Sequence, residues 1–236
     1  GKTTNHLLEL AHEASSSPSK REIDLLLSTG EQVSISLFSM ILNDMGYPAI
    51  GLTGTQAGIK TKGLHTRNTI EDIDVSRIQK HLSEGKIVLV AGFQGVNALG
   101  DITTLGRGGS DTTAVALASK LGCSAEIYTD VQGIYGVDPR LYPKAQKLDF
   151  ISFEEMKEMA FLGAKVMEPR SIEIAHRFNT AVYVGSAHED VPGTWIKESD
   201  ASMEEKSISG LSVSENVMMV NVRRLPAQAK HMANLF

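Results

Sequence analysis

The arrangement of apolar and polar positions in the first part of the chain predicts three amphipathic helices. Apolar side chains recur three and four residues apart in residues 7–14, 33–41 and 75–82, so each segment has one apolar face. The first segment is followed by Ser-Ser-Ser-Pro and the other two by Gly46 and Gly85, which are residues typical of helix ends. We therefore expect three helices that each pack one face against a core.

Farther along the chain, the pattern changes to strands and helices in alternation. Residues 86–91 are apolar at almost every position, as in a strand that is covered on both faces of a parallel sheet. The remaining expected elements are a glycine-rich loop at 92–111, strands at 125–129 and 181–184, and helices at 112–121, 153–161 and 170–178. This alternation predicts an α/β fold, a three-layer αβα sandwich around a mostly parallel sheet.

A change in composition after residue 198 divides the chain. Residues 199–205 are polar and show no periodicity, so we expect a linker there and a main domain over residues 1–198. Beyond it, residues 208–211 and 217–222 have the pattern of strands, and Pro226 can open a helix. Because one βα unit cannot bury a core alone, residues 206–236 are expected to be part of a domain that is completed by another chain or by further sequence.

Composition narrows the class of protein. Hydrophobic residues make up 42% and charged residues 22% of the chain, values near the globular average that exclude a disordered or fibrous protein. The net charge of −5 argues against nucleic acid or an anionic membrane as the main partner. A single cysteine, no signal-peptide pattern and no apolar run of membrane-spanning length favour a soluble, cytoplasmic protein. The histidines are scattered, so no metal site is predicted.

The most informative motif is the glycine-rich segment at residues 106–113, whose sequence is GRGGSDTT. Its glycines let the backbone approach a ligand closely, and the N–H groups of the helix that follows can point at an anion. The planar fork of Arg107 fits a carboxylate or a phosphate. The structural alternative is a tight turn in which Ser110 or Asp111 caps the helix. Arginine, serine and aspartate together in one turn favour the binding site.

Two further segments allow both a functional and a structural interpretation. Residues 128–140, YTDVQGIYGVDPR, follow a strand at the edge where α/β sheets place their ligands. They could equally be an ordinary turn, with Asp138-Pro139 starting a short helix. Residues 28–31, STGE, match a helix capping box, and taken alone they favour a cap over a ligand contact.

The motifs together, in their order along the chain, resemble those of the aspartate kinases in the amino acid kinase family. They are STGE (28–31), VAGFQG (90–95), TTLGRGGSDTTAVA (103–116), YTDVQGIYGVDPR (128–140) and LGAKV (162–166). The resemblance covers roughly residues 1–198 and implies the amino-acid kinase or carbamate kinase-like fold. The segment from Lys206 onward resembles the opening βα unit of the ACT regulatory domain that follows the kinase domain in that family.

The resemblance implies ATP-dependent phosphorylation of the β-carboxylate of L-aspartate, the first step toward lysine, threonine and methionine. In that role Glu31 would contact the substrate ammonium group and Arg107 its α-carboxylate. Asp111 would organise the transfer. The aspartate pocket would be completed by Thr4, Gly108, Gly109 and Ser110, and the ATP site would be lined by Thr129, Asp130, Tyr135, Asp138 and Arg140, with Lys165 reaching the phosphates.

The resemblance also implies ATP and Mg²⁺ as cofactors, a homo-oligomer, and lysine or threonine as an effector at the ACT region of the full-length protein. Phosphorylation of a carboxylate is consistent with the residue types in these motifs. A carboxylate is already deprotonated at neutral pH, so it needs no general base and needs mainly positioning and charge neutralisation.

Two features depart from the family pattern. Aspartate kinases begin with a strand and a Lys-x-Gly-Gly-Thr-Ser phosphate loop, and this chain starts at Gly1-Lys2-Thr3-Thr4 instead. We therefore expect the chain as printed to be a poor catalyst. The segment at residues 166–169 reads Val-Met-Glu-Pro where the family usually has Val-Leu-His-Pro, so Glu168 replaces a histidine.

Two other functions stay open at this point. One is a different small-molecule kinase of the same fold, acting on glutamate, carbamate or a nucleotide. The other is a non-catalytic, ligand-binding regulatory chain.

Overall fold

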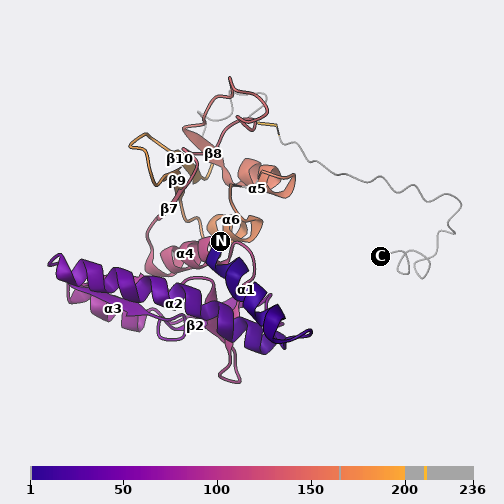
Figure 1. Cartoon of the computed structure of the whole chain (residues 1–236). Helices are drawn as coiled ribbons and strands as arrows, with labels where there is room; N and C mark the ends of the chain where they lie inside the picture. Colours follow the sequence, from indigo (N-terminus) through magenta and orange to yellow (C-terminus); the bar gives the residue numbers. More distant parts are fainter. Residues whose placement is uncertain (1, 165, 200–209, 212–236) are drawn as a thin grey trace, which may run out of the picture.

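The computed structural model describes residues 2–164, 166–199, 210 and 211 (Figure 1). Its helices are α1 (Lys2–Ala14), α2 (Lys20–Asp44), α3 (Ser76–Ser83), α4 (Gly109–Leu121), α5 (Phe153–Phe161) and α6 (Pro169–Arg177). Its strands are β1 (Ala49–Leu52), β2 (Ile59–Lys62), β3 (Thr69–Ile73), β4 (Ile87–Val90), β5 (Gln94–Val96), β6 (Ile102–Thr104), β7 (Ala125–Thr129), β8 (Phe150–Ser152), β9 (Val182–Ser186) and β10 (Thr194–Lys197).

The strands form three sheets. The first pairs β1 with β4 in parallel, the second has the order β3-β2-β5-β6, and the third has the order β7-β9-β10-β8. Among the described strands the parallel pairs are β1–β4, β2–β5, β7–β9 and β8–β10, and the antiparallel pairs are β2–β3, β5–β6 and β9–β10. The expected α/β class with mostly parallel pairing is confirmed.

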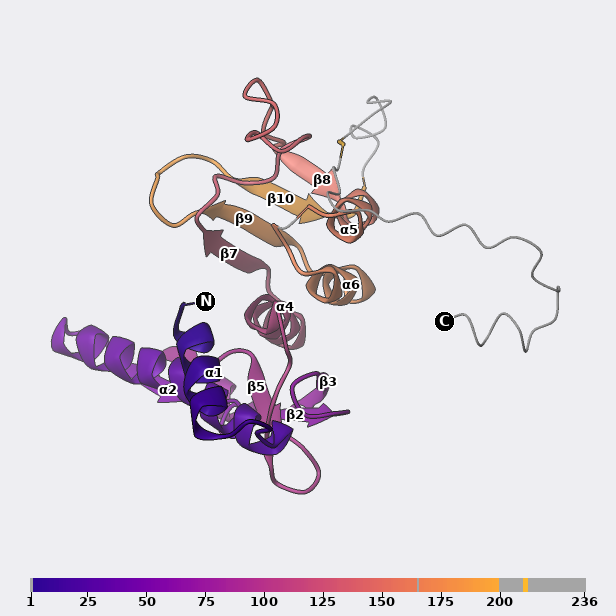
Figure 2. The same cartoon turned by 45° about the vertical axis from the view of Figure 1, so that its right-hand side comes forward.

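Helix α4 connects the two halves of the molecule. It packs side by side with α6, between the N-terminal elements and the sheet that contains β7–β10 (Figure 2). Val115 of α4 belongs to the core formed with α5, α6 and the third sheet. Its neighbour Ala116 belongs to the other core, which includes Leu52, Ile59 and Ile78. Because α4 is held by two cores, its first turn has a fixed position.

Helix α2 differs from the sequence-based expectation. A helix was expected over residues 33–41 with a capping box before it, but α2 begins at Lys20 and runs through that segment. The capping-box interpretation is therefore wrong. The hydroxyl groups of Ser28 and Thr29 donate to the carbonyl oxygens of Leu25 and Leu26, each at 2.7 Å, so both side chains are accommodated inside a continuous helix.

Helix α2 is also long and apolar enough to cross a membrane, judged by length and composition only. In the structure it packs against α1, β1 and β6. Its Asp24 is fully buried and accepts hydrogen bonds from the backbone N–H of Thr66 and the hydroxyl of Thr104, and it pairs with His65 Nδ1 at 2.7 Å. These contacts fix the N-terminal half of α2 on the β6 side of the second sheet.

The other expected elements appear close to their expected positions, as α1, α3, β4, α4, β7, α5, α6 and β9. The glycine-rich loop expected at 92–111 is wrong in part, because β5 and β6 pair within it. The expected linker at 199–205 and partial regulatory domain at 206–236 lie outside the described residues, except for residues 199, 210 and 211.

Candidate functional site

The glycine-rich turn lies directly at the start of α4. Gly106 and Gly108 have φ values of +80° and +64°, in the left-handed region that glycine adopts without steric cost. Gly108 is the N-cap residue, so the expectation that Ser110 or Asp111 caps the helix is wrong. Within the part of the chain that the structure describes, the backbone N–H groups of Ser110 and Asp111 donate to no acceptor. These groups are available to an anion at the positive end of the helix dipole.

The turn is held between two neighbouring segments. The N–H of Phe93 donates to Thr113 Oγ1 at 2.9 Å, and a Cβ atom at Gly109 would stand 3.0 Å from the Phe93 ring. On the other side, a guanidinium nitrogen of Arg170 donates to the carbonyl oxygen of Leu105 at 3.3 Å. Position 109 therefore leaves no room for a side chain, which explains the glycine.

Asp111 and Glu168 form the acidic part of this site. Asp111 stands in the first turn of α4 and Glu168 is the N-cap residue of α6, where its side chain makes no capping hydrogen bond. The pKa of Asp111 is raised above its usual value, first because burial penalises the charged form and second because Glu168 is a nearby negative charge. Sequence reasoning noted Glu168 as a departure, but nothing in the sequence placed it beside Asp111.

A cavity of about 370 Å³ connects this turn to α2. It brings together Glu31 from the middle of α2, Gly92 after β4, and Ser110 and Thr113 from α4. Its remaining wall is apolar and is made by Val88, Val90, Ala114 and Leu117. Two residues expected to bind the substrate, Glu31 and Ser110, thus face one space although they are far apart in sequence. Thr113 was not expected there.

The other residues expected to bind the substrate lie around this cavity without lining it. Arg107 is exposed in the turn and makes no hydrogen bond or ion pair with another described residue. Thr4 is half-buried on α1, which packs against α2 beside Gly30, where Thr3 lies 3.3 Å from the position of a Cβ atom. Gly108 and Gly109 belong to the turn itself.

The residues expected to bind the nucleotide lie in the long connection after β7. Thr129 ends β7, and its hydroxyl donates to Asp130 at 3.0 Å. Tyr135 donates its hydroxyl to Gln132 at 2.9 Å. Asp138 accepts from the guanidinium of Arg140 at 2.7 Å, and this pairing lowers the pKa of Asp138 below its usual value.

The short helix considered at Asp138-Pro139 is not formed. The carbonyl oxygen of Asp138 accepts from the N–H groups of Leu141 and Tyr142, which makes a turn. Lys165, which was expected to reach the phosphates, lies outside the described residues.

Comparison with known proteins assigns this chain to a family. The family model described as the amino acid kinase family matches residues 1–186. The chain belongs to the amino acid kinase family. This match covers both the α2 side of the cavity and the α4 turn, and it includes β7 and the connection that follows.

Within this family, the curated relatives of this chain include aspartokinases. The chain is 49% identical over 238 residues to an aspartokinase of Geobacillus stearothermophilus and 46% identical over 237 residues to aspartokinase 2 of Bacillus subtilis. Each alignment covers 100% of this chain and 58% of the relative, so the chain spans little more than half the length of the curated relatives it matches.

Solved structures of aspartate kinases share the fold. The aspartate kinase of Synechocystis has a TM-score of 0.73 and 47% identity, and covers 85% of this chain and 33% of its own. Aspartokinase III of E. coli, solved in complex with aspartate and ADP, has a TM-score of 0.72 and 33% identity over 85% of this chain and 46% of its own. A UMP kinase of Bacillus anthracis has 16% identity and a TM-score of 0.56, and this similarity supports a shared fold only.

Proposed function

We propose that the protein containing this chain is an aspartate kinase, which transfers the γ-phosphoryl group of ATP to the β-carboxylate of L-aspartate. The product is 4-phospho-L-aspartate, the first intermediate toward lysine, threonine and methionine. The observation that carries the proposal is the position of Glu31 across a cavity from the first turn of α4, in a chain 49% identical to an aspartokinase. An α-amino acid needs one anion for its ammonium group and cationic or N–H groups for its carboxylates, and this cavity has both kinds of group on opposite sides.

Aspartate would be held at both ends of its backbone. The Glu31 carboxylate pairs with the ammonium group, and the exposed guanidinium of Arg107 holds the α-carboxylate in a bidentate contact. Ser110, Gly108 and Gly109 would supply the turn against which the substrate lies, and Thr4 would approach the substrate from α1. This orientation leaves the β-carboxylate free to approach the phosphate.

The reaction then depends on positioning more than on acid–base chemistry. The β-carboxylate is deprotonated at neutral pH, and its oxygen forms the new P–O bond while the bond from the γ-phosphorus to the bridging oxygen of ADP breaks. Two anions approach one another, so the charge must be offset. The N-terminus of α4 contributes partial positive charge at Ser110 and Asp111. By the resemblance of its motif, Lys165 would add a full positive charge for the phosphates.

Magnesium is the cation that kinases commonly use with ATP, and the oxygen donors at this site are suited to it. Asp111 and Glu168 are close enough for the charge of Glu168 to raise the pKa of Asp111, which is the arrangement that a nearby cation relieves. When bound, Mg²⁺ would neutralise charge on the phosphate oxygens. Asp111 and Glu168 would orient the hydrated ion, and Asp111 would thereby organise the transfer.

ATP would be bound in the connection that follows β7. Thr129 and Asp130 stand at the carboxyl end of that strand, the edge at which open α/β sheets bind ligands. Tyr135 would contact the base or ribose. Asp138 and Arg140, which pair with one another at 2.7 Å, would line the same nucleotide site.

Self-association and feedback complete the proposal. On α2, Val33, Leu37, Met40 and Ile41 are exposed, and their spacing places them on one helix face. This apolar row supports a homo-oligomer in which a second copy covers it.

An E. coli relative has been solved with lysine and aspartate, and we infer a lysine or threonine effector for the segment from residue 206 onward. The free cysteine, Cys123, suits the reducing cytoplasm.

A panel of phosphoryl acceptors tests the function. The intact protein is incubated with Mg-ATP and aspartate, glutamate, carbamate or UMP, and ADP release is coupled to NADH oxidation. We expect turnover with aspartate that exceeds turnover with each other acceptor. Preference for another acceptor would assign a different kinase of this fold. Tight ATP binding without turnover on any acceptor would favour the non-catalytic regulatory chain.

A further inference from the structure

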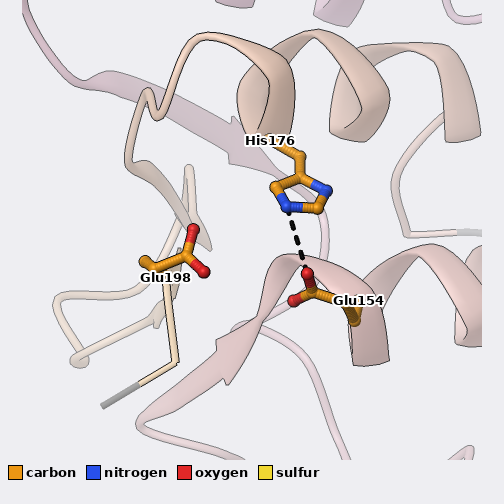
Figure 3. Close-up of side chains that lie close together, drawn as sticks. All are labelled: Glu154, His176 and Glu198. Atoms are coloured by element: carbon orange, nitrogen blue, oxygen red, sulfur yellow. Dashed lines mark ion pairs between the residues drawn. The ribbon is translucent and has the colours of Figure 1, made fainter.

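Three side chains meet where the start of α5, the end of α6 and the end of β10 come together. Glu154 lies in the first turn of α5, His176 in the last turn of α6, and Glu198 directly after β10. Each offers one possible ligand atom, and these atoms all lie within 4.8 Å of one another. Figure 3 shows the imidazole of His176 and the two carboxylates directed toward the same space. We propose that these three residues form a binding site for a divalent transition-metal ion, with zinc as its representative.

The surrounding fold fixes two of the three groups before any ion binds. The ring of Phe153, which is fully buried, stacks on the His176 imidazole with 5.4 Å between centroids and 19° between planes. Ser152 and Glu155 satisfy one another in a capping box at the start of α5. Glu155 is therefore used by the helix end, whereas Glu154 turns to His176, with 3.1 Å between Oε1 and Nε2.

The register of the sheet brings the third group to this place. In the parallel pair of β10 and β8, Lys197 lies opposite Ser152. The residue after Lys197 is Glu198, and the residue after Ser152 is Phe153, the first residue of α5. Glu198 therefore lies just past the end of the sheet, beside the start of α5. The three residues are 22 positions apart in sequence from one to the next, so no ligand spacing could have indicated the site.

The dimensions suit a tetrahedral ion. Zinc binds histidine nitrogen and carboxylate oxygen at about 2.1 Å, so two ligands of a tetrahedron stand roughly 3.4 Å apart. The Glu154–His176 pair is already at 3.1 Å, and the ligand atom of Glu198, within 4.8 Å of the other two, needs a shift of at most about 1.4 Å, which an exposed carboxylate can make by rotation. A water molecule would take the fourth position.

Ligand chemistry selects the class of ion. Two carboxylates beside one imidazole offer negative charge that a divalent cation neutralises. Magnesium and calcium prefer sites made of oxygen alone, whereas imidazole favours zinc and its neighbours in the first transition series. The site is separate from the proposed phosphoryl transfer, since His176 stands at the end of α6 away from Glu168, about 12 Å along the helix. A bound ion would tie the point where the chain leaves β10 to α5 and α6.

Metal binding to the intact protein tests the proposal. The protein is freed of metal and nucleotide and carries Cys123→Ser, which removes an exposed thiol that could bind zinc. Zinc is then titrated by calorimetry, and Co²⁺ is added separately to record its visible absorption bands. We expect one saturable zinc site, and a Co²⁺ spectrum of a four-coordinate ion with a nitrogen ligand.

Two ligand variants and one control variant decide whether these residues are the ligands. His176→Gln and Glu198→Gln should each lower the zinc affinity by at least about tenfold. Loss of a residue that only hydrogen-bonds to a metal ligand already lowers the affinity by about that much. The control is His81→Gln, because His81 and Glu84 form a similar pair at 3.3 Å. Thermal melts of the metal-free variants verify their folding, and a variant that fails to fold is replaced by Glu154→Gln. Absence of saturable binding, or equal affinity in folded ligand variants and the control, would overturn the site and leave an ordinary ion pair.

Discussion

Gly108 and Glu168 lie so close that a Cβ atom at Gly108 would stand 2.3 Å from the Cβ of Glu168. The same glycine has a φ of +64°. Both constraints act on the residue immediately before α4, so Gly108 and Glu168 are packed against one another where that helix begins. This contact also places the Glu168 carboxylate beside Asp111, which connects the start of α6 to the proposed site of phosphoryl transfer.

Alanine at position 108 should therefore destabilise the protein more than the φ angle alone explains. Gly122 is a matched control, because it has a φ of +70° and no atom within 4 Å of its Cβ position. Gly122→Ala should cost about 1–2 kcal/mol of unfolding free energy. Gly108→Ala should cost roughly 1–3 kcal/mol more because of the overlap with Glu168. Urea unfolding of both variants measures the difference, and equal losses would mean that the contact with Glu168 is absent.

Asp111 should lower stability at neutral pH, and Asp111→Asn should raise it. The pKa of Asp111 is raised in the folded protein above the ordinary value of 3.8, so the folded state keeps this proton to a higher pH than the unfolded state does. The contribution of Asp111 to stability therefore decreases as the pH rises from 3.8 through the raised pKa. Thermal melts should show a gain for Asp111→Asn at pH 7 that disappears below about pH 3.8. A gain that persists at low pH would contradict this.

Glu168→Gln should shift the acidic side of the pH–rate profile. Burial is the larger cause of the raised pKa of Asp111 and the charge of Glu168 is the smaller one. Removing that charge should lower the pKa of Asp111 toward its ordinary value without reaching it. The acidic limb of kcat/KM for aspartate should then move to lower pH. An upward shift would show that Glu168 acts on this site through something other than its charge.

Arg107→Lys tests whether Arg107 contacts aspartate or ATP. The substitution keeps the positive charge and loses the bidentate geometry. Since a charge-assisted hydrogen bond contributes about 1.5–3 kcal/mol, the KM for aspartate should rise about tenfold or more. The KM for ATP should change little. Steady-state kinetics with each substrate varied in turn would reveal the opposite pattern if Arg107 contacts the nucleotide.

Glu31→Gln tests the group proposed for the substrate ammonium. Glu31 lies in the interior of α2 rather than at its start, so it has no capping role to lose and the melting temperature should stay nearly unchanged. Aspartate binding measured by calorimetry should be lost with the negative charge. The control is Glu9→Gln, an exposed position on α1 that should leave binding unaltered. Normal aspartate affinity in Glu31→Gln would remove Glu31 from the proposed site.

The parts of the fold that the sequence predicts are those set by local patterns. The apolar run at β4 and the glycine turn before α4 are both in their expected places, because a buried strand and a left-handed turn each need particular residue types. Seven of the ten strands in the described residues were not predicted, among them the short strands β2 and β6. Their four and three residues are rich in threonine and lysine, and their positions depend on pairing with neighbours rather than on their own pattern.

The errors in the candidate site have the same physical origin. Ser28 and Glu31 have the residue types and the spacing of a capping box. Only the packing of α2 shows that the helix starts at Lys20, eight residues before Ser28. The contact of Glu168 with Gly108 joins residues 60 positions apart, which no local pattern reports. The likeness of the motifs to a family indicated which residues act together, and the structure places Glu31 and Ser110 on one cavity.

The site of phosphorylation on the substrate tests the central claim most directly. The intact protein is incubated with Mg-ATP and aspartate, and the acyl phosphate is reduced with borohydride, which converts a phosphorylated carboxyl group to an alcohol. Phosphorylation of the β-carboxylate gives homoserine, whereas phosphorylation of the α-carboxylate gives 3-amino-4-hydroxybutanoate. The account predicts homoserine in amounts that match the ADP released. The other alcohol, or ADP release without either alcohol, would contradict it.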